Sequence, residues 1–385
     1  MMNEPRVAVI TPGSFVIPSG NSSSVERVAE QSIPLAAEGL NIRIYGICGE
    51  GKDEIGSVGK IPVHRYPKGS AYIRSVQASL LHWRPQVIDV MNRPRIAYTL
   101  KQALPQTKVA LSLHSLSFIS EPHLRHEQAA RYVASVDAIV ANSTYLGEEL
   151  KSRFPAIADR VYVNWLGVSI ADFPSRWSPQ QDNLRRAQLQ QQGWTGRKII
   201  MYAGRLLPIK GIHHLLAALP DLVKAVPEVM VVIIGSAFYG SGTSTAYEAK
   251  LHQLATPYRH HVTFIPLVSH SEMPKWYRLA DVIVVPSGEG EAFGLVNVEA
   301  MASGVPVVAS SAGGIPEIVQ DGLTGLTLPV DRLDRDLSAA LIRLLQDDEL
   351  SRSMGLAGRS RVVQHFRWQY TADRWHELMQ MLAKR

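Results

Sequence analysis

The chain has 385 residues and a formal net charge of +6. Because a single hydrophobic core rarely grows beyond about 250–300 residues, this length predicts two domains, each large enough to bury its own core. The first residues do not resemble a signal peptide, no apolar run is long enough to span a membrane, and the lone Cys48 excludes an internal disulfide and a multi-cysteine zinc site. These features predict a cytoplasmic protein.

The excess positive charge lies in the first half of the chain. Residues 1–190 carry 21 Lys and Arg against 16 Asp and Glu, whereas residues 191–385 carry 19 against 18. The basic residues are scattered rather than clustered, which is typical of a solvated surface and argues against nucleic acid as a partner. Weak peripheral contact with an anionic membrane is compatible with this charge.

Short apolar runs alternate with helical patterns along the first half. This alternation predicts a doubly wound parallel sheet of the α/β class. The expected strands are residues 6–11, 41–48, 87–91, 108–114, 138–141 and 160–165, and the expected helices include 25–38, 127–135 and 146–154.

A polar, Gln-rich segment at residues 178–193 interrupts the alternation, which then restarts. The strands expected in the second half are residues 198–203, 228–235, 261–266, 281–286 and 305–310. Domain boundaries are therefore predicted at 1–190 for the first domain and 191–369 for the second. The last helix, 370–385, has apolar residues at helical spacing and is expected to dock on the first domain.

The turn after residues 198–203 carries two basic residues. Gly204 and Arg205 follow this strand directly, and Lys210 and Gly211 precede an apolar helix pattern over residues 212–219. In doubly wound sheets, ligands bind beyond the carboxyl ends of the strands. Arg205 and Lys210 can therefore both meet phosphate oxygens near free backbone N–H groups.

Two carboxylates, Glu291 and Glu299, stand around the start of another predicted helix, with Gly294 between them. If all eight steps were helical, the carboxylates would lie about 12 Å apart along the axis and about 80° apart around it. They cannot then act as one paired site. The separation instead suits a long ligand held at two places, where Gly294 lets the backbone approach and a helix N-terminus offers N–H groups to phosphate. A nucleotide sugar has those dimensions.

Together these motifs resemble glycosyltransferase family 4, whose members are retaining sugar-nucleotide transferases. The resemblance implies two facing Rossmann-like, doubly wound parallel-sheet domains, the GT-B architecture. Residues 235–240 and 293–299 look most like the spore coat protein SA type. The matching positions are Gly204, Arg205, Lys210, Gly211, Ala280, Asp281, Pro286, Ser287, Glu291, Phe293, Gly294, Glu299, residues 313–317, Asp321, Gly322 and Gly325, with 136–143 in the first half.

The resemblance assigns the donor nucleotide to the second domain. Arg205 and Lys210 would bind the donor diphosphate, and the backbone N–H groups around Gly294 and Leu295 would assist. Glu299 would accept hydrogen bonds from the ribose hydroxyls.

The resemblance assigns further groups to the transferred sugar. Glu291 would lie beside the sugar, and His114, at the end of the strand at 108–114, would reach it from the first domain. Gly20 stands in the first-domain loop where the family commonly has a glycine pair, and is the candidate donor contact there.

The expected activity is metal-independent, retaining transfer of a hexose from a nucleotide diphosphate sugar, UDP-glucose by default, to an unknown acceptor such as a cell-envelope or spore-coat glycan. The protein would be cytoplasmic or peripheral to the membrane or spore coat. A sugar-nucleotide epimerase of the same fold and a non-catalytic spore coat or scaffold component are the alternatives.

No metal and no cofactor beyond the donor are expected. Asp334 and Asp336 imitate a metal-binding pair, but they open the helix pattern at 337–345 and are typical of first-turn acids. The histidine pairs at 213–214 and 260–261 are adjacent in sequence, so two neighbours cannot face one site from a regular element.

Overall fold

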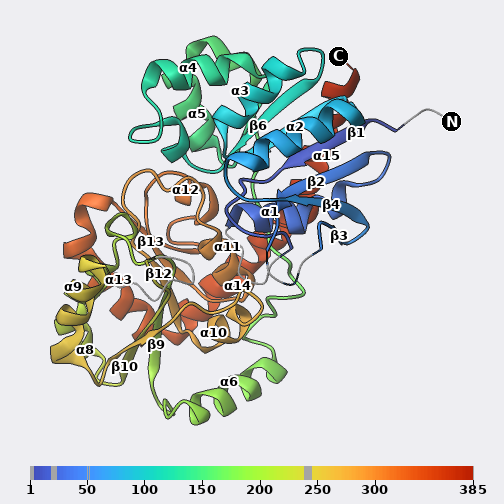
Figure 1. Ribbon diagram of the computed structural model, residues 1–385. Helices are drawn as coiled ribbons and strands as arrows, with labels where there is room; N and C mark the ends of the chain where they lie inside the picture. Colours follow the sequence, from blue (N-terminus) through green and yellow to red (C-terminus); the bar gives the residue numbers. More distant parts are fainter. Residues whose placement is uncertain (1–3, 19–23, 50, 52, 238–244, 385) are drawn as a thin grey trace. The chain divides into compact units, whose positions relative to one another are not determined.

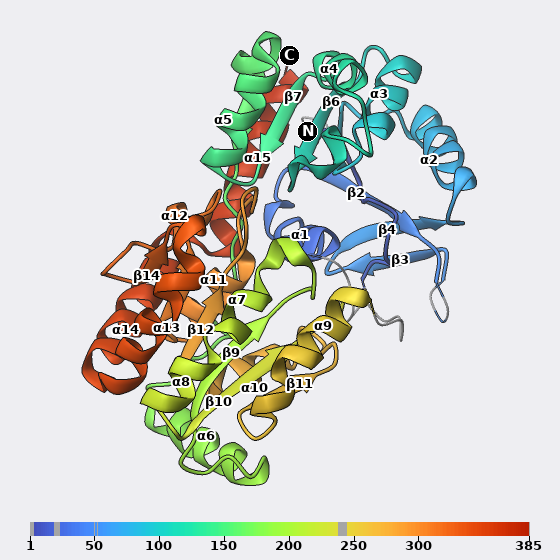
Figure 2. The ribbon, with the colours of Figure 1, turned by 90° about the vertical axis from the view of Figure 1, so that its left-hand side faces the viewer.

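The computed structural model describes residues 4–18, 24–49, 51, 53–237 and 245–384. The chain divides into two compact units (Figure 1). Unit 1 contains Met1–Leu166 and Trp368–Arg385, and unit 2 contains Gly167–Arg367. Each unit is built on one sheet with helices packed against it, as the α/β prediction requires (Figure 2).

The sheet of unit 1 has the strand order β3-β4-β2-β1-β5-β6-β7-β8. All neighbouring strands are parallel except β3 and β4, which pair antiparallel. The strands are β1 Arg6–Ile10, β2 Asn41–Ile47, β3 Ile55–Val58, β4 Ile61–Tyr66, β5 Val87–Met91, β6 Lys108–Leu113, β7 Ala138–Ala141 and β8 Val161–Val163.

Three features of unit 1 differ from the prediction. The β3–β4 hairpin was not expected, because its burial alternates along each strand instead of forming a continuous apolar run. The strand expected at 160–165 shrinks to β8, a half-buried edge strand. The helix expected at 25–38 ends at Ser32, and Pro34, which has no backbone N–H, opens a separate 3₁₀ turn.

The helices of unit 1 pack against this sheet and against one another. They are α1 Ser24–Ser32, η1 Pro34–Ala36, α2 Ser70–Trp83, α3 Pro94–Ala103, η2 Leu116–Ile119, α4 His126–Ser135, α5 Thr144–Arg153, η3 Pro155–Arg160 and α15 Trp368–Lys384.

The C-terminal helix α15 belongs to unit 1, where it contacts α1, η1 and β5. Its buried face carries Trp375, Leu378, Met379 and Leu382. The Trp375 indole donates a hydrogen bond to Asp89 Oδ2 at 2.7 Å, in the middle of the sheet. Burial raises the pKa of Asp89, while the bonds from Trp375 and Ser112 oppose that rise. Helix α15 is thus fastened to β5 by a buried polar contact as well as by apolar packing.

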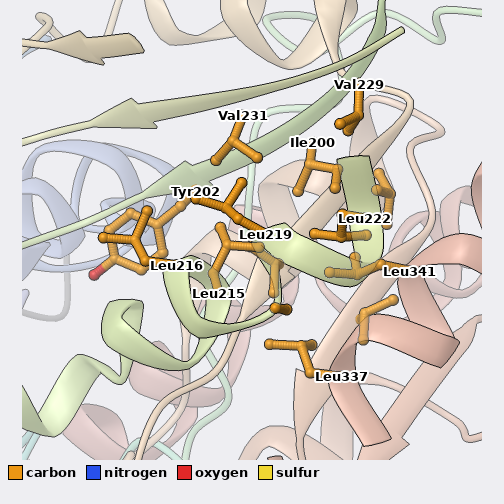
Figure 3. Close-up of a cluster of buried hydrophobic side chains, with 14 of the residues drawn as sticks. Ile200, Tyr202, Leu215, Leu216, Leu219, Leu222, Val229, Val231, Leu337 and Leu341 are labelled. Carbon is orange, nitrogen blue, oxygen red and sulfur yellow. The ribbon is translucent and has the colours of Figure 1, made fainter. Parts of the chain in front are cut away.

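Unit 2 has a wholly parallel sheet with the strand order β11-β10-β9-β12-β13-β14. A core of aliphatic side chains from β9, β10, α7, α8 and α13 packs on it (Figure 3). The strands are β9 Lys198–Ala203, β10 Val229–Ile234, β11 Val262–Ile265, β12 Val282–Val285, β13 Val307–Ser310 and β14 Gly325–Leu328. The last strand was not predicted.

Among the helices of unit 2, η4 carries the predicted site residue Lys210, and α11 carries Leu295 and Glu299. The longest, α14, has 18 residues. Across the described ranges, no helix combines the length and apolar character that a membrane span needs. The helices are α6 Pro179–Gln191, η4 Pro208–Lys210, α7 Ile212–Ala217, α8 Leu219–Ala225, α9 Ala246–Ala255, η5 Thr256–Tyr258, α10 Met273–Leu279, α11 Leu295–Ala302, α12 Ile315–Ile318, η6 Val330–Arg332, α13 Leu333–Gln346 and α14 Asp348–His365.

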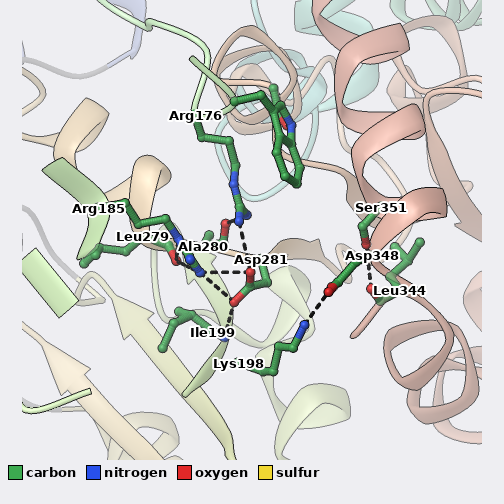
Figure 4. A network of polar contacts seen from close by, with 12 residues as sticks. Arg176, Arg185, Lys198, Ile199, Leu279, Ala280, Asp281, Leu344, Asp348 and Ser351 are labelled. Atoms are coloured by element: carbon green, nitrogen blue, oxygen red, sulfur yellow. Dashed lines mark hydrogen bonds and ion pairs between the residues drawn. The ribbon is translucent and has the colours of Figure 1, made fainter. Parts of the chain in front are cut away.

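The first division between the units follows Leu166, not residue 190, and the second follows Arg367, not residue 369. The cause is α6, which is fastened to unit 2. Arg185 of α6 donates to both oxygens of Asp281, each at 2.9 Å, and Arg176 donates to the same carboxylate at 3.0 Å (Figure 4). The polar segment that was used to place the domain boundary therefore contains a helix held to unit 2 by its polar side chains.

Candidate active site

The turn after β9 carries the two basic residues of the predicted phosphate site. Arg205 is exposed, and its carbonyl accepts a hydrogen bond from Tyr202 Oη at 2.8 Å. Gly211 has φ 67°, and a Cβ placed there would lie 1.8 Å from the carbonyl oxygen of Pro286. Only glycine permits this approach. The turn after β9 is thereby pressed against the loop after β12.

That approach brings Lys210 to Glu291. Lys210 Nζ lies 2.5 Å from Glu291 Oε2, and Ser287 Oγ donates to the same oxygen at 3.0 Å. Behind them, Ser310 Oγ donates to the Ser287 carbonyl at 2.5 Å. Lys210, predicted to bind the diphosphate, and Glu291, predicted to lie beside the sugar, are therefore in direct contact.

Glu291 is held as an anion. Burial by itself raises the pKa of its carboxyl group, but the charge of Lys210 and the hydrogen bonds from Lys210 and Ser287 outweigh burial, so the pKa is lowered. Its carbonyl accepts a hydrogen bond from the Gly314 N–H at 2.9 Å. Gly313, at φ 54°, would place a Cβ 2.0 Å from that carbonyl oxygen. The loop after β13 thus supports the backbone of Glu291.

The segment from Glu291 to Glu299 is only half helical. Helix α11 begins at Leu295, after Gly294 in the left-handed region with φ 91°, and no side chain caps its first turn. Glu291 therefore lies in a loop, and the spacing worked out for eight helical steps does not apply. Gly294 and Leu295 stand where backbone N–H groups of the first turn begin.

Glu299 lies inside α11, and its residue surface is 5% exposed. Tyr277 Oη of α10 donates to Glu299 Oε2 at 2.8 Å. His270 Nε2, from the loop after β11, lies 3.4 Å from Glu299 Oε1. No sequence motif pointed to Tyr277 or His270.

A pocket of about 100 Å³ opens at the carboxyl ends of β9 and β10, within unit 2. A Cβ at Gly235 would lie 2.0 Å from the Gly204 carbonyl oxygen, so two loops meet at its floor. This is the edge of the sheet at which a doubly wound fold binds its ligand. The pocket is lined by Ala203, Gly204, Arg205, Ile234, Gly235, Ser236, Leu267, Val268 and Met273.

His114 belongs to unit 1 and follows β6 directly. Its backbone N–H donates to Asn92 Oδ1 at 2.8 Å. Both ring nitrogens are buried, and neither has a hydrogen-bond partner among the described residues. His114 lines a cavity of about 20 Å³ together with Asp89 and Trp375. Burial lowers the pKa of His114 to about 4, so the imidazole is neutral at pH 7.

The remaining candidates fall elsewhere. Gly20 lies outside the described residues. Asp334 sits in the first turn of α13, as expected, and contacts His214 Nδ1 at 2.5 Å. His213 Nδ1 instead faces Tyr247 Oη at 2.8 Å. Within the part of the chain that the structure covers, no three His, Cys, Asp or Glu side chains form a metal-binding group.

Comparison with known proteins places this chain in a family. Residues 185–361 match the family model described as glycosyl transferases group 1. Spore coat protein SA of Bacillus subtilis (strain 168) is 29% identical over 371 residues, covering 96% of this chain and 97% of that protein. YtcC of the same organism is 30% identical over 294 residues, covering 76% of this chain and 72% of that protein. The chain belongs to the group 1 glycosyl transferases.

Solved structures agree with this membership at the level of the fold. The HepE protein of Anabaena in complex with UDP-glucose has a TM-score of 0.79 at 20% identity, over 98% of this chain and all of that one. Sucrose-phosphate synthase from Thermosynechococcus elongatus also has a TM-score of 0.79, at 23% identity, over 98% and 99%. The fold is GT-B, and the protein is a glycosyltransferase that takes its sugar from a nucleotide sugar.

Two kinds of residue in this candidate site escaped the sequence reasoning. Tyr277 and His270 lie outside the motifs on which the resemblance was based. Ser287 was recognised as part of a motif, but its bond to Glu291 could not be seen from the sequence. The Lys210–Glu291 contact joins residues 81 positions apart and depends on the missing Cβ of Gly211.

Proposed function

We propose that this glycosyltransferase is a metal-independent, retaining hexosyltransferase whose donor is a nucleotide diphosphate sugar, with UDP-glucose as the first donor to test. The observation that carries the proposal is the contact of Lys210 and Ser287 with Glu291, whose carboxylate also feels the charge of Arg205, a residue that lines the pocket of unit 2. The UDP-glucose bound by the HepE protein supports the choice of donor.

Arg205 and Lys210 supply fixed positive charge for the diphosphate, so the leaving group needs no metal ion to neutralise it. The uncapped first turn of α11, at Gly294 and Leu295, adds N–H dipoles of the same sign. Glu299 accepts hydrogen bonds from the ribose hydroxyls.

In the reaction, the bond between the sugar anomeric carbon and the diphosphate oxygen breaks, and the diphosphate leaves with the electron pair. The acceptor hydroxyl attacks from the face that the diphosphate leaves, which retains the anomeric configuration, and its proton passes to the departing phosphate oxygen. Glu291, ionised at neutral pH, stabilises the positive charge that develops on the sugar.

His114 is the proposed contribution of unit 1. Because burial keeps its imidazole neutral, it can act as a hydrogen-bond partner of a sugar hydroxyl but not as a cation. Its contact with the donor sugar stays a prediction, as does donor contact by Gly20.

The acceptor is proposed to be a cell-envelope or spore-coat glycan, because spore coat protein SA matches nearly the whole chain. Such an acceptor suits a cytoplasmic enzyme with peripheral contact to an anionic membrane or to the coat. Sedimentation with vesicles containing anionic lipid, compared with neutral vesicles, tests the membrane contact.

The test of the proposal is a binding screen of UDP-, GDP- and ADP-sugars, followed by donor hydrolysis with and without EDTA. A transferase should bind one donor and release free sugar slowly without an acceptor, equally well in EDTA. Arg205→Ala and Lys210→Ala should each weaken nucleoside diphosphate binding by about 1.5–3 kcal/mol. Conversion of the donor sugar to its epimer would indicate the epimerase, and absence of any donor binding would indicate a scaffold component.

A further inference from the structure

The carboxylate of Glu299 has a different neighbour on each oxygen. Tyr277 Oη donates to Oε2 at 2.8 Å, and His270 Nε2 lies 3.4 Å from Oε1. Because Glu299 is 5% exposed, water cannot solvate its charge freely. A buried carboxylate is stable only where donors meet its oxygens, so the bond from Tyr277 fixes the orientation of the group.

Tyr277 cannot easily turn away from Glu299. The residue is fully buried, and its ring packs edge-to-face on Phe173 with centroids 5.8 Å apart and an interplanar angle of 62°. Met273, one helical turn earlier on the same face of α10, lines the pocket next to Arg205. Tyr277 therefore connects the Glu299 carboxylate to α10, the helix that supplies Met273 to the pocket lining.

His270 lies on the Oε1 side of the Glu299 carboxylate and has an unsatisfied ring nitrogen. Its Nε2 is buried and has no hydrogen-bond partner among the described residues, although Glu299 Oε1 is only 3.4 Å away. Buried ring nitrogens are normally satisfied by protein, water or ligand. The same loop supplies Leu267 and Val268 to the pocket. The unsatisfied nitrogen thus lies on a loop that lines the proposed donor site.

We propose that His270 and Glu299 together bind the 2′-hydroxyl of the donor ribose, with Tyr277 as the positioning residue for Glu299. A hydroxyl oxygen at about 2.8 Å from each atom bridges Oε1 and Nε2. It donates its proton to the carboxylate and accepts one from the His270 Nε2–H. The inference rests on the proposed function, which assigns Glu299 to the ribose, and extends that site to two residues outside the family motifs.

The experiment compares a nucleoside diphosphate with its 2′-deoxy form by isothermal titration calorimetry on the full chain. UDP, GDP and ADP are each paired with their 2′-deoxy counterparts, and the tightest-binding pair is used. The quantity of interest is the ratio of the deoxy to the ribo Kd. Tyr277→Phe removes only the hydroxyl, and His270→Phe keeps a ring against Phe173, 5.6 Å away between centroids. Tyr258→Phe in η5 is the matched control.

Wild type should prefer the ribonucleotide by about tenfold or more, since the deoxy form cannot donate a hydrogen bond to the charged carboxylate. Tyr277→Phe and His270→Phe should each lower that ratio by at least about threefold, and Tyr258→Phe should not change it. A purely structural role would weaken both ligands equally and leave the ratio intact, which would overturn the inference.

The variant Glu299→Ala distinguishes failure of this inference from failure of the proposed function. If Glu299→Ala keeps the wild-type ratio, the assignment of Glu299 to the ribose is wrong and the proposed site fails with it. If Glu299→Ala abolishes the preference while the Tyr277 and His270 variants retain it, only the roles of those two residues are refuted.

Discussion

Replacing Glu291 by Gln should tighten the binding of bare UDP. Lys210 Nζ lies 2.5 Å from Glu291 Oε2, with 27% and 14% of the two side chains exposed. Diphosphate must draw Lys210 away from that carboxylate or share it. A charge-assisted hydrogen bond contributes about 1.5–3 kcal/mol and a neutral one about 0.5–1.5 kcal/mol. The amide of the Gln variant should therefore hold Lys210 less strongly than the carboxylate does, by about 1 kcal/mol. That difference corresponds to about fivefold tighter UDP binding.

Titration calorimetry with UDP at pH 7.5 measures the affinity, and donor turnover measures the chemistry. The lowered pKa of Glu291 keeps the wild-type carboxylate ionised at that pH. The rate constant kcat should fall by about a hundredfold in Glu291→Gln, because the developing charge on the sugar loses an anion. Glu148→Gln, which alters an ion pair with Lys151 in unit 1, is the control and should change neither quantity. Weaker or unchanged UDP binding in Glu291→Gln would refute the competition for Lys210.

Three further predictions concern stability, measured by urea unfolding. Trp375→Phe should cost about 1–3 kcal/mol, because it leaves Asp89 Oδ2 buried without its donor; a cost near zero would contradict this. Asp281→Ala should cost about 3–5 kcal/mol, because it strands the buried Arg176; a milder effect would show that water replaces the ion pair. Wild type should lose up to about 3 kcal/mol between pH 6.5 and pH 4, because unfolded His114 binds a proton that the folded protein, with its pKa near 4, does not; His114→Gln should abolish that slope.

Much of the fold was predictable where burial is continuous. The strands expected at 87–91 and 138–141 have those bounds in β5 and β7, because every residue in them is buried. The β3–β4 hairpin was missed because an edge hairpin exposes alternate residues and Pro62 interrupts its second strand. The polar segment of α6 was taken to mark the domain boundary, because the sequence does not reveal that Arg185 has a carboxylate partner 96 positions away.

The candidate site was predictable in its residue types but not in its contacts. Arg205, Lys210, Glu291 and Glu299 were found because they follow strand ends at spacings that the family shares. Their partners depend on loops brought together by glycines, and no sequence periodicity encodes that approach. The role of Tyr277 could not be predicted, because the sequence of a short helix does not distinguish a site tyrosine from a tyrosine that only packs in the core.

The two places at which the chain passes between the units, after Leu166 and after Arg367, lie next to each other. Val168 pairs with Arg367 as an isolated bridge, and its N–H donates to the Phe366 carbonyl at 2.9 Å, so the two ends of unit 2 are hydrogen-bonded to each other. Residues 167–367 thus form a cassette whose ends meet, inserted between Leu166 and Trp368. A short peptide could join those two residues after excision and keep α15 on its sheet. In the same way, a donor-binding cassette from another family member could be exchanged at this seam without cutting either sheet.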